Sequence, residues 1–459
     1  MRLASIFQQA SPSQLWDKEQ RIRRKKFLKA WKPWEDIQAG VLAIPENSAV
    51  PNGRTIPLTY ALIRKKNKGL SNAPILVLTG GPGISALQSM PFWIGSTLRD
   101  NHDLILVDQR GTDFSNALPN IAPALFGIMA KDLSPKEECE SVHALMKSFI
   151  HQPIFDRIDT SKYHPYQSVE DLVCLMQHLG YHSYHLLGLS HGTKLSSILM
   201  DRYPCLIKSS ILYGPWPTNA SFFQNLPAHF TQAWEWFLQQ LKMEGIPCPQ
   251  ARLDQVLEQL QKNPITIQVK GQLFVLKAKD VIFLLRYFLY FPDARTKIPS
   301  FLDALIKRDR KRLQQLTNRP FHMVCGKVNL TTYASSLAYD ECDEDSSYKL
   351  DEECSQDHYF QSGLAFFPSF ARHLSLWKQS SISQEQRPLQ PHQIPSLIMV
   401  HEGDPVTPPS QGLDMQQTLL NSEMTLLKEC GHVYLDESKF ALMNAFFSDQ
   451  SVSFSHNFG

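Results

Sequence analysis

Cysteines are scarce in this sequence, and long apolar runs are missing. Its 459 residues include 8 cysteines with no CxxC pair, so we expect neither a disulfide scaffold nor a structural zinc site. No run of about 18 apolar residues occurs, which argues against a membrane span. The HExxH helix of metalloproteases and the lysine-bearing P-loop are also lacking. We therefore expect no membrane-spanning segment, no metal and no cofactor.

An excess of charge of one sign is missing as well. The sequence has 46 Lys and Arg against 44 Asp and Glu, a net charge of +2. The chain as a whole therefore has no field for binding nucleic acid or another polyanion. Hydrophobic residues make up 43% and charged residues 20%, ordinary proportions for a globular protein. They exclude dominant disorder, collagen and coiled coil, and no pattern indicates an oligomeric state.

The N-terminal segment does not resemble a secretory signal. Gln8 and Gln9 interrupt its apolar stretch before a hydrophobic region can form, so we expect a cytoplasmic protein. A helix is predicted over 15–31, and it carries the basic run 21–26. Such a run suits a nuclear, membrane or partner-binding role. We favour the alternative of a solvated helix that leads into the folded domain.

Short apolar runs rich in β-forming residues alternate with helical patterns along most of the chain. We predict strands at 74–79, 103–107, 184–187, 210–213, 396–400 and 424–427, and an opening antiparallel pair at 38–44 and 55–64. Continuous apolar strands are buried on both faces, as in a parallel sheet covered by helices. The pattern indicates an α/β fold with a mostly parallel central sheet.

The middle of the chain has a different character. Helical periodicity dominates, with helices predicted at 230–243, 253–262, 278–290 and 300–316 and a hairpin around Gly271. This stretch reads as a mainly helical insertion rather than a continuation of the sheet. We divide the chain into an N-terminal helical extension (1–37), a first core segment (38–216), a helical cap (217–391) and a second core segment (392–459).

The strongest local signal is Gly188-Leu189-Ser190-His191-Gly192. It lies between the strand predicted at 184–187 and a helical pattern. A serine on such a turn needs small neighbours, because the backbone is strained and the turn packs tightly. Its oxygen is then exposed above the sheet edge, at the N-terminus of a helix. Ordinary glycine-rich turns match the pattern by chance, but this position between strand and helix favours a nucleophile at Ser190.

A serine hydroxyl becomes a good nucleophile only when a base removes its proton. The order expected for this architecture is Ser, then an acid, then His. Asp404 and His432 each follow a predicted strand, at the edge where α/β sheets place their active sites. Alone, they could be a turn aspartate and a surface histidine. In this order we expect a triad in which Ser190 attacks, His432 acts as base and Asp404 orients the imidazole.

An acyl-transfer intermediate needs preset N–H donors for its oxyanion. We expect these to be the backbone of His191 and that of Gly81, which lies in the glycine-rich run 80–83. Glycines let the backbone approach a substrate closely, so Gly80 and Gly83 are expected to contact it. The run could instead be a phosphate-binding loop. That interpretation is disfavoured, because the run lacks the Lys-Ser/Thr ending and the wider glycine spacing of a P-loop.

Together these motifs resemble the α/β-hydrolase superfamily and, within it, the proline iminopeptidase and tripeptidyl-aminopeptidase-like serine peptidases. The matching segments are 80–83, 108–112, 188–192, 403–408 and 431–432. The resemblance implies an α/β-hydrolase fold with a large helical cap between nucleophile and acid. It also implies an aminopeptidase that releases N-terminal residues through an acyl-enzyme. Three residues, Thr79, Asp113 and His191, depart from the family pattern. These departures are expected to change the lining of the substrate pocket.

An aminopeptidase must recognise a cationic N-terminus, which calls for carboxylates near the pocket. Glu344 and Asp345 match a Cys-x-Glu-Asp segment of the tripeptidyl-aminopeptidase-like branch, so the resemblance implies a role in substrate binding. A solvated acidic loop is the other interpretation. Cys342 and Cys354 flank this loop and could form a disulfide, although free thiols are the expectation for a cytosolic protein.

Other functions remain open at this point. A carboxylester hydrolase could use the same triad, so the substrate is a peptide or a small ester. The complete triad disfavours a noncatalytic binding protein. Arg110 is expected to be structural, ion-paired beneath the glycine-rich loop. The apolar segment 283–290 could line either type of pocket, but we favour a plain buried helix face.

Overall fold

The computed structural model describes residues 12–69, 73–341, 370, 373–377 and 390–448. Within these residues the main sheet has eight strands in the order β1-β2-β4-β3-β5-β6-β9-β10. The strands are β1 (Ile37–Pro45), β2 (Thr55–Ile63), β3 (Ile75–Leu78), β4 (Leu104–Val107), β5 (Tyr184–Leu189), β6 (Ile207–Tyr213), β9 (Ser396–Gly403) and β10 (Ser422–Cys430). Pairing is antiparallel for β1–β2 and β2–β4 and parallel for the rest. The predicted mostly parallel sheet is confirmed.

Both faces of the sheet are buried because successive strand residues enter different hydrophobic cores. In β3, Leu76 and Leu78 point into one core, whereas Ile75 and Val77 point into the other. The first core is closed by α5 (Pro165–His178), α6 (His191–Arg202) and α14 (Pro409–Thr418). The second is closed by α1 (Pro12–Trp31), α2 (Met90–Gly95) and α15 (Glu437–Ser448). This double burial explains why the strands are continuously apolar in the sequence.

The N-terminal helix α1 is docked on the sheet rather than merely attached to it. Phe27 stacks on Phe114 with ring centroids 4.5 Å apart. Arg23 forms an ion pair with Asp113, and Arg24 Nε donates to the Phe114 carbonyl at 2.8 Å. The basic run is mostly exposed, as expected for a solvated helix, but Arg23 and Arg24 also find partners in the loop after β4.

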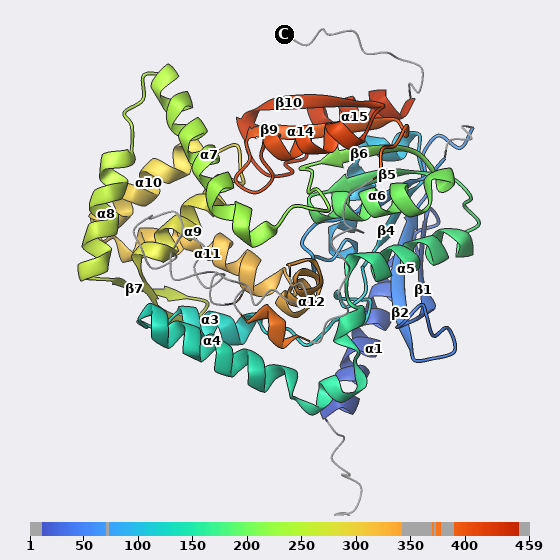
Figure 1. Ribbon diagram of the computed structural model, residues 1–459, viewed down its shortest axis with the longest axis horizontal. Coiled ribbons are helices and arrows are strands. Elements are labelled where there is room, and N and C mark those ends of the chain that lie inside the picture. Colours follow the sequence, from blue (N-terminus) through green and yellow to red (C-terminus); the bar gives the residue numbers. More distant parts are fainter. Residues whose placement is uncertain (1–11, 70–72, 342–369, 371–372, 378–389, 449–459) are drawn as a thin grey trace, which may run out of the picture.

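The cap lies beside the sheet in Figure 1 and is mainly helical, as expected. Its elements are α7 (Phe222–Met243), α8 (Gln250–Lys262), β7 (Ile265–Val269), β8 (Gln272–Leu276), α9 (Ala278–Phe288), α10 (Ala294–Ile306), α11 (Arg310–Gly326) and α12 (Leu330–Glu341). The predicted hairpin is confirmed by antiparallel pairing of β7 and β8. The single helix predicted over 300–316 is wrong, because Arg308 adopts a left-handed backbone (φ 49°) and Asp309 then caps α11.

Two helices from outside the predicted cap segment pack with the cap. They are α3 (Ala122–Met129) and α4 (Pro135–Ile150), which the sequence places in the first core segment. They share one hydrophobic core with the cap helices, and Figure 1 shows them running along the cap. The Phe126 ring, for example, lies 5.5 Å from Phe274 and 5.6 Å from Phe321 between centroids. We propose that the cap is assembled from two stretches of chain, about 121–155 and the segment after residue 216.

Candidate active site

Ser190 occupies a sharp turn between β5 and α6. Its φ is 54°, a left-handed value that strains a residue with a side chain. A Cβ atom on Gly192 would lie 1.9 Å from the Leu78 carbonyl oxygen, and one on Gly188 would lie 2.5 Å from Ser196 Oγ. The two glycines therefore let the start of α6 pack directly against the strands. This close packing holds the Ser190 side chain at the sheet edge.

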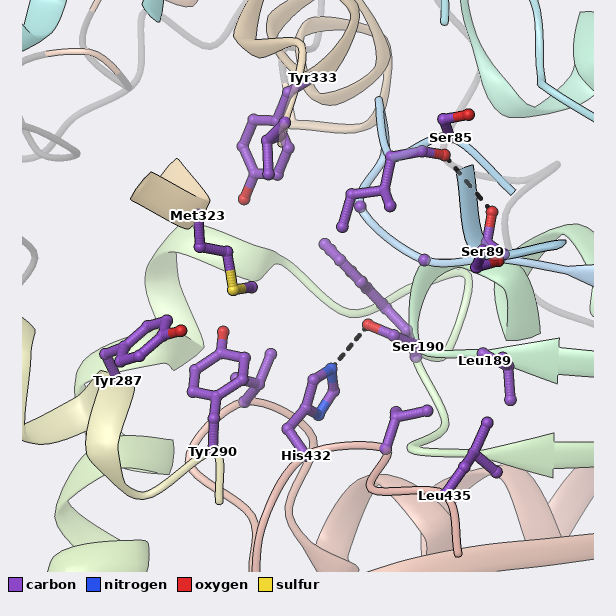
Figure 2. Close-up of a pocket in the computed structure, with 18 of the residues that line it drawn as sticks. Ser85, Ser89, Leu189, Ser190, Tyr287, Tyr290, Met323, Tyr333, His432 and Leu435 are labelled. Atoms are coloured by element: carbon purple, nitrogen blue, oxygen red, sulfur yellow. Dashed lines mark hydrogen bonds between the residues drawn. The ribbon is translucent and has the colours of Figure 1, made fainter. Parts of the chain in front are cut away.

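The structure brings Ser190, His432 and Asp404 together in one hydrogen-bonded chain. Ser190 Oγ lies 2.8 Å from His432 Nε2, as Figure 2 shows. On the far side of the ring, His432 Nδ1 lies 2.8 Å from Asp404 Oδ2 and 3.1 Å from Oδ1. The three side chains follow β5, β9 and β10, whose carboxyl ends meet at one edge of the sheet. This is the geometry of a nucleophile, a base and an acid that orients the base.

Asp404 is held in its ionised form by its surroundings. It is completely buried and accepts hydrogen bonds from Val406 N, Thr407 N and Thr407 Oγ1 at 2.8 to 3.0 Å. Burial alone would raise the pKa of Asp404, but the charge of His432 and these hydrogen bonds outweigh it and lower the pKa. The carboxylate can therefore stabilise a protonated His432. The role of Thr407 was not found in the sequence, because it depends on a side-chain contact.

The cap contacts His432 directly through Tyr290. The Tyr290 carbonyl accepts from His432 N at 3.1 Å, and the two rings meet edge to face with centroids 5.3 Å apart. The interpretation of 283–290 as only a buried helix face is wrong for part of this segment. Its residues that line the cavity above Ser190 are Phe283, Arg286, Tyr287 and Tyr290.

The glycine-rich loop lies against the nucleophile. A Cβ atom on Gly80 would come within 2.8 Å of Ser190 Cβ, and both Gly80 and Gly81 line the cavity. Gly83 is absent from the described lining; its carbonyl instead accepts from Asn329 N at 2.9 Å. Gly83 thus joins the glycine-rich loop to the cap. The sequence predicts a contact with the substrate for Gly83 and does not predict this contact with the cap.

The His191 side chain is not part of the described cavity lining. The side chain is buried, its ring meets Trp216 edge to face, and neither ring nitrogen has a hydrogen-bond partner among the described residues. Burial, aided by the charge of Lys194, lowers the pKa of His191 to about 3, so the ring is neutral. The residue is the first of α6, where backbone N–H groups have no partner within the helix. Its N–H and that of Gly81 stay our prediction for the oxyanion hole.

The motif after β4 is structural. Buried Asp108 accepts from Ser85 Oγ at 2.8 Å and from Phe114 N at 3.0 Å, which ties the glycine-rich loop to the neighbouring strand. Arg110 is also buried and forms a two-pronged ion pair with Asp171 of α5 at 2.6 and 2.7 Å. The expected ion pairing of Arg110 is confirmed.

One cavity of about 390 Å³ opens above Ser190 and is lined by both halves of the molecule. The sheet side contributes Thr79, Gly80, Gly81, Leu189, Ser190 and His432, and the cap side contributes Phe222, Phe283, Arg286, Tyr287, Tyr290, Met323 and Tyr333. Figure 2 shows Tyr290 beside His432, with Met323 and Tyr333 reaching in from the cap. Most lining side chains are apolar or aromatic. Among the described residues of this lining there is no carboxylate, and Arg286 is the single arginine or lysine.

Several predictions concern residues for which the structure provides no test. Glu344, Asp345, Cys342 and Cys354 lie outside the described residues. Within the part of the chain that is described, no cluster of His, Cys, Asp and Glu could hold a metal ion. In that same part, no helix is both long and apolar enough to span a bilayer.

No curated protein matches the chain, but solved structures resemble it. An α/β hydrolase enzyme from a Medee basin deep-sea metagenome library is 14% identical (TM-score 0.42; 91% of this chain, 100% of that one). A serine hydrolase from the bacterium Cycloclasticus zankles is 14% identical (TM-score 0.41; 90% and 99%). A proline iminopeptidase-related protein from Thermus thermophilus is 16% identical (TM-score 0.40; 90% and 96%).

A family model gives the firmer assignment. The model described as the alpha/beta hydrolase fold matches residues 73–439. That match spans the sheet strands from β3 to β10 and the cap between them. The protein therefore belongs to the α/β hydrolase family.

Proposed function

We propose that this α/β hydrolase is a serine hydrolase that cleaves an acyl bond through an acyl-enzyme on Ser190. One observation carries the proposal: a continuous chain of hydrogen bonds runs from Asp404 through His432 to Ser190 Oγ. The end of this chain lines a cavity large enough for a small organic substrate. The nucleophile, the base and the binding space are therefore adjacent.

The reaction follows from the positions of these atoms. His432 Nε2 takes the proton of Ser190 Oγ as that oxygen attacks the substrate carbonyl carbon. Backbone N–H groups of Gly81 and His191 stabilise the oxyanion, at about 3 kcal/mol for each donor. His432 then donates the proton to the leaving group. A water molecule, activated by the same histidine, attacks the acyl-enzyme and releases the acid.

The described lining supports an ester, or an amide without a free amino terminus, as the substrate. A cationic N-terminus needs a carboxylate close by, whereas the arginine Arg286 is the charged residue that the described cap residues place at the cavity. This observation favours the carboxylester hydrolase over the aminopeptidase. The aminopeptidase expectation depends on Glu344 and Asp345, outside the described residues, and stays a prediction.

A substrate panel tests the proposal. Short-chain aryl esters, aminoacyl and tripeptidyl anilides, and N-blocked anilides are offered to the wild type and to Ser190→Ala. Labelling by a fluorophosphonate, which reacts with activated serines, is followed in parallel. Ser148→Ala serves as a matched control, because Ser148 is an exposed serine on α4.

Turnover of esters and labelling by the fluorophosphonate are expected in the wild type and in Ser148→Ala, and both should be lost in Ser190→Ala. Free-amine anilides cleaved far better than esters and N-blocked anilides would instead identify an aminopeptidase. Absence of both turnover and labelling in the wild type would leave a noncatalytic binding protein and would refute the proposal.

A further inference from the structure

Arg286 is a buried cation that has no counter-ion among the described residues. It lies on α9, lines the cavity and is 6% exposed. Its Nη2 donates to Tyr290 Oη at 3.1 Å, and the guanidinium carbon is 5.8 Å from the centre of that ring. Within the described part of the chain, Nε is buried with no hydrogen-bond partner, and no carboxylate lies within ion-pairing distance of the guanidinium.

Among the described residues, this arrangement leaves a buried charge without a compensating partner in the unliganded protein. A buried charge is stable when it is paired and hydrogen-bonded, and it is costly otherwise. This chain satisfies another buried guanidinium, that of Arg110, with the carboxylate of Asp171. Arg286 is also buried, but its Nε has no partner among the described residues. A guanidinium fork that lines a mostly apolar cavity matches the geometry of a carboxylate.

Tyr290 sets the position of this cation relative to the reacting atoms. Its carbonyl accepts from His432 N, and its hydroxyl accepts from Arg286 Nη2. One tyrosine therefore spans the interval from the catalytic histidine to the guanidinium. A group bound by Arg286 would lie a short alkyl chain away from the acyl carbon that Ser190 attacks.

We propose that Arg286 binds a carboxylate of the substrate, so that the enzyme prefers carboxylic esters that carry a second, ionised carboxyl group. The inference rests on the proposed function and deepens it by naming a substrate class: monoesters of dicarboxylic acids. The apolar side chains of the cavity contact the methylene chain, and the guanidinium selects its charged end.

Binding to an inactive protein tests this without requiring turnover. Monoethyl esters of glutaric, adipic and suberic acid are titrated by calorimetry into Ser190→Ala, beside the corresponding neutral diethyl esters. At least one monoester is expected to bind more tightly than its diester. Adding Arg286→Gln should weaken that monoester about 10- to 100-fold, the range for a charge-assisted hydrogen bond, and should weaken the diester far less.

Two further variants separate recognition from structure. Arg286→Lys keeps the charge but loses the fork, so an intermediate affinity for the monoester is expected. Arg312→Gln removes an exposed cap arginine that contacts Ser300, and it should not change the binding of either ester. If Arg286→Gln fails to fold, as judged by thermal unfolding, Arg286→Lys carries the comparison.

The inference is overturned if no monoester binds Ser190→Ala better than its diester, or if the preference survives Arg286→Gln. It is also overturned if both esters weaken equally, because Arg286 would then only hold Tyr290 in place. Failure of the proposed function is visible separately, as a wild type that neither turns over esters nor reacts with the fluorophosphonate.

Discussion

Two buried arginines, Arg110 and Arg286, belong to different regions of the molecule and differ in how their charges are paired. Arg110, at the sheet, donates from Nε and Nη2 to the two carboxylate oxygens of Asp171, and from Nη1 to the carbonyls of Glu46 and Lys162. Arg286, in the cap, has one hydrogen bond to a tyrosine and a buried Nε without a partner among the described residues. The sheet region pairs its buried charge internally, whereas the described part of the cap leaves one open at the cavity.

This difference in charge pairing matches two different roles of the sheet region and the cap. Asp404 and Arg110 are surrounded by fixed donors and acceptors, so the sheet holds the catalytic groups in one geometry. The described cap residues surround the substrate space with rings, methionine and one unpaired cation. The sheet region thus positions Asp404 through hydrogen bonds that satisfy its carboxylate. Selectivity is expected from Arg286 in the cap, because a buried donor without a partner among the described residues gains from binding a ligand.

The largest effect on activity is expected in the sheet region, at Asp404. Asp404→Asn should lower kcat by ~10⁴-fold, because His432 loses the carboxylate that sets its tautomer and stabilises its charge. The measurement is hydrolysis of whichever ester the wild type cleaves best. Asp414→Asn, which changes an exposed aspartate on α14, is the matched control. A loss of less than tenfold in Asp404→Asn would show that Asp404 does not act on His432.

Breaking the paired arginine should cost stability rather than activity. Asp171→Asn leaves the Arg110 charge buried and uncompensated, so the free energy of unfolding should fall by about 3–5 kcal/mol. Denaturant unfolding measures it. Glu170→Gln, on the same helix, removes the partner of exposed Arg202 and should cost less than about 1 kcal/mol. Equal losses in the two variants would contradict the view that burial makes the Arg110 pair important.

Acid should weaken the sheet region through its neutral buried histidines. Burial, aided by His102 and Lys208, lowers the pKa of His185 to about 3, against about 6.5 in an unfolded chain. Between these values the unfolded state binds a proton that the folded state does not. Stability is therefore present above about pH 6.5 and is lost as the pH falls towards 3, at about 1.4 kcal/mol per pH unit for this histidine.

His185→Gln tests the acid prediction. Denaturant unfolding at several pH values should give a shallower loss of stability in the variant than in the wild type. An unchanged slope in His185→Gln would mean that this histidine is already protonated, or already solvated, in the folded protein.

The smallest effect on stability is expected at Arg286. Its substitution should raise the free energy of unfolding or leave it equal, whereas Asp171→Asn should lower it. Arg286→Met removes a buried charge that lacks a counter-ion among the described residues, so the free energy of unfolding should stay equal or rise by about 1 kcal/mol. Thermal unfolding beside Arg312→Met provides the comparison. A loss as large as that of Asp171→Asn would mean that Arg286 is structural, and the contrast between the two regions would fail.

Much of the catalytic geometry could be predicted because it is encoded locally. Ser190 lies in a glycine-flanked turn, and Asp404 and His432 follow apolar strands, so strand ends alone place them at one edge of the sheet. Arg286 could not be assigned in the same way. In the sequence it is an arginine within an apolar helix, and its lack of a carboxylate partner among the described residues becomes visible only when the neighbouring segments are in place.

The extent of the cap also could not be predicted from the sequence. Residues 121–155 stand between two sheet elements in the chain, and the sequence places them in the first core segment. Yet Phe126 of α3 packs against Phe274 and Phe321, and buried residues of α3 and α4 share one hydrophobic core with the cap helices. Periodicity indicates that a helix has an apolar face but does not identify the surface that will cover it.

The amino-acid sequence by itself determined the order of the strands in the chain, the strained serine turn and the identity of the acid and base that follow it. These depend on backbone preferences and on spacing within single strand–helix units. Only the tertiary structure decided which distant side chains share the cavity, that Tyr290 joins His432 to Arg286, and that the guanidinium stays unpaired among the described residues. Those properties depend on packing between segments far apart in the chain, because burial and pairing belong to the assembled neighbourhood of a residue and not to the residue alone.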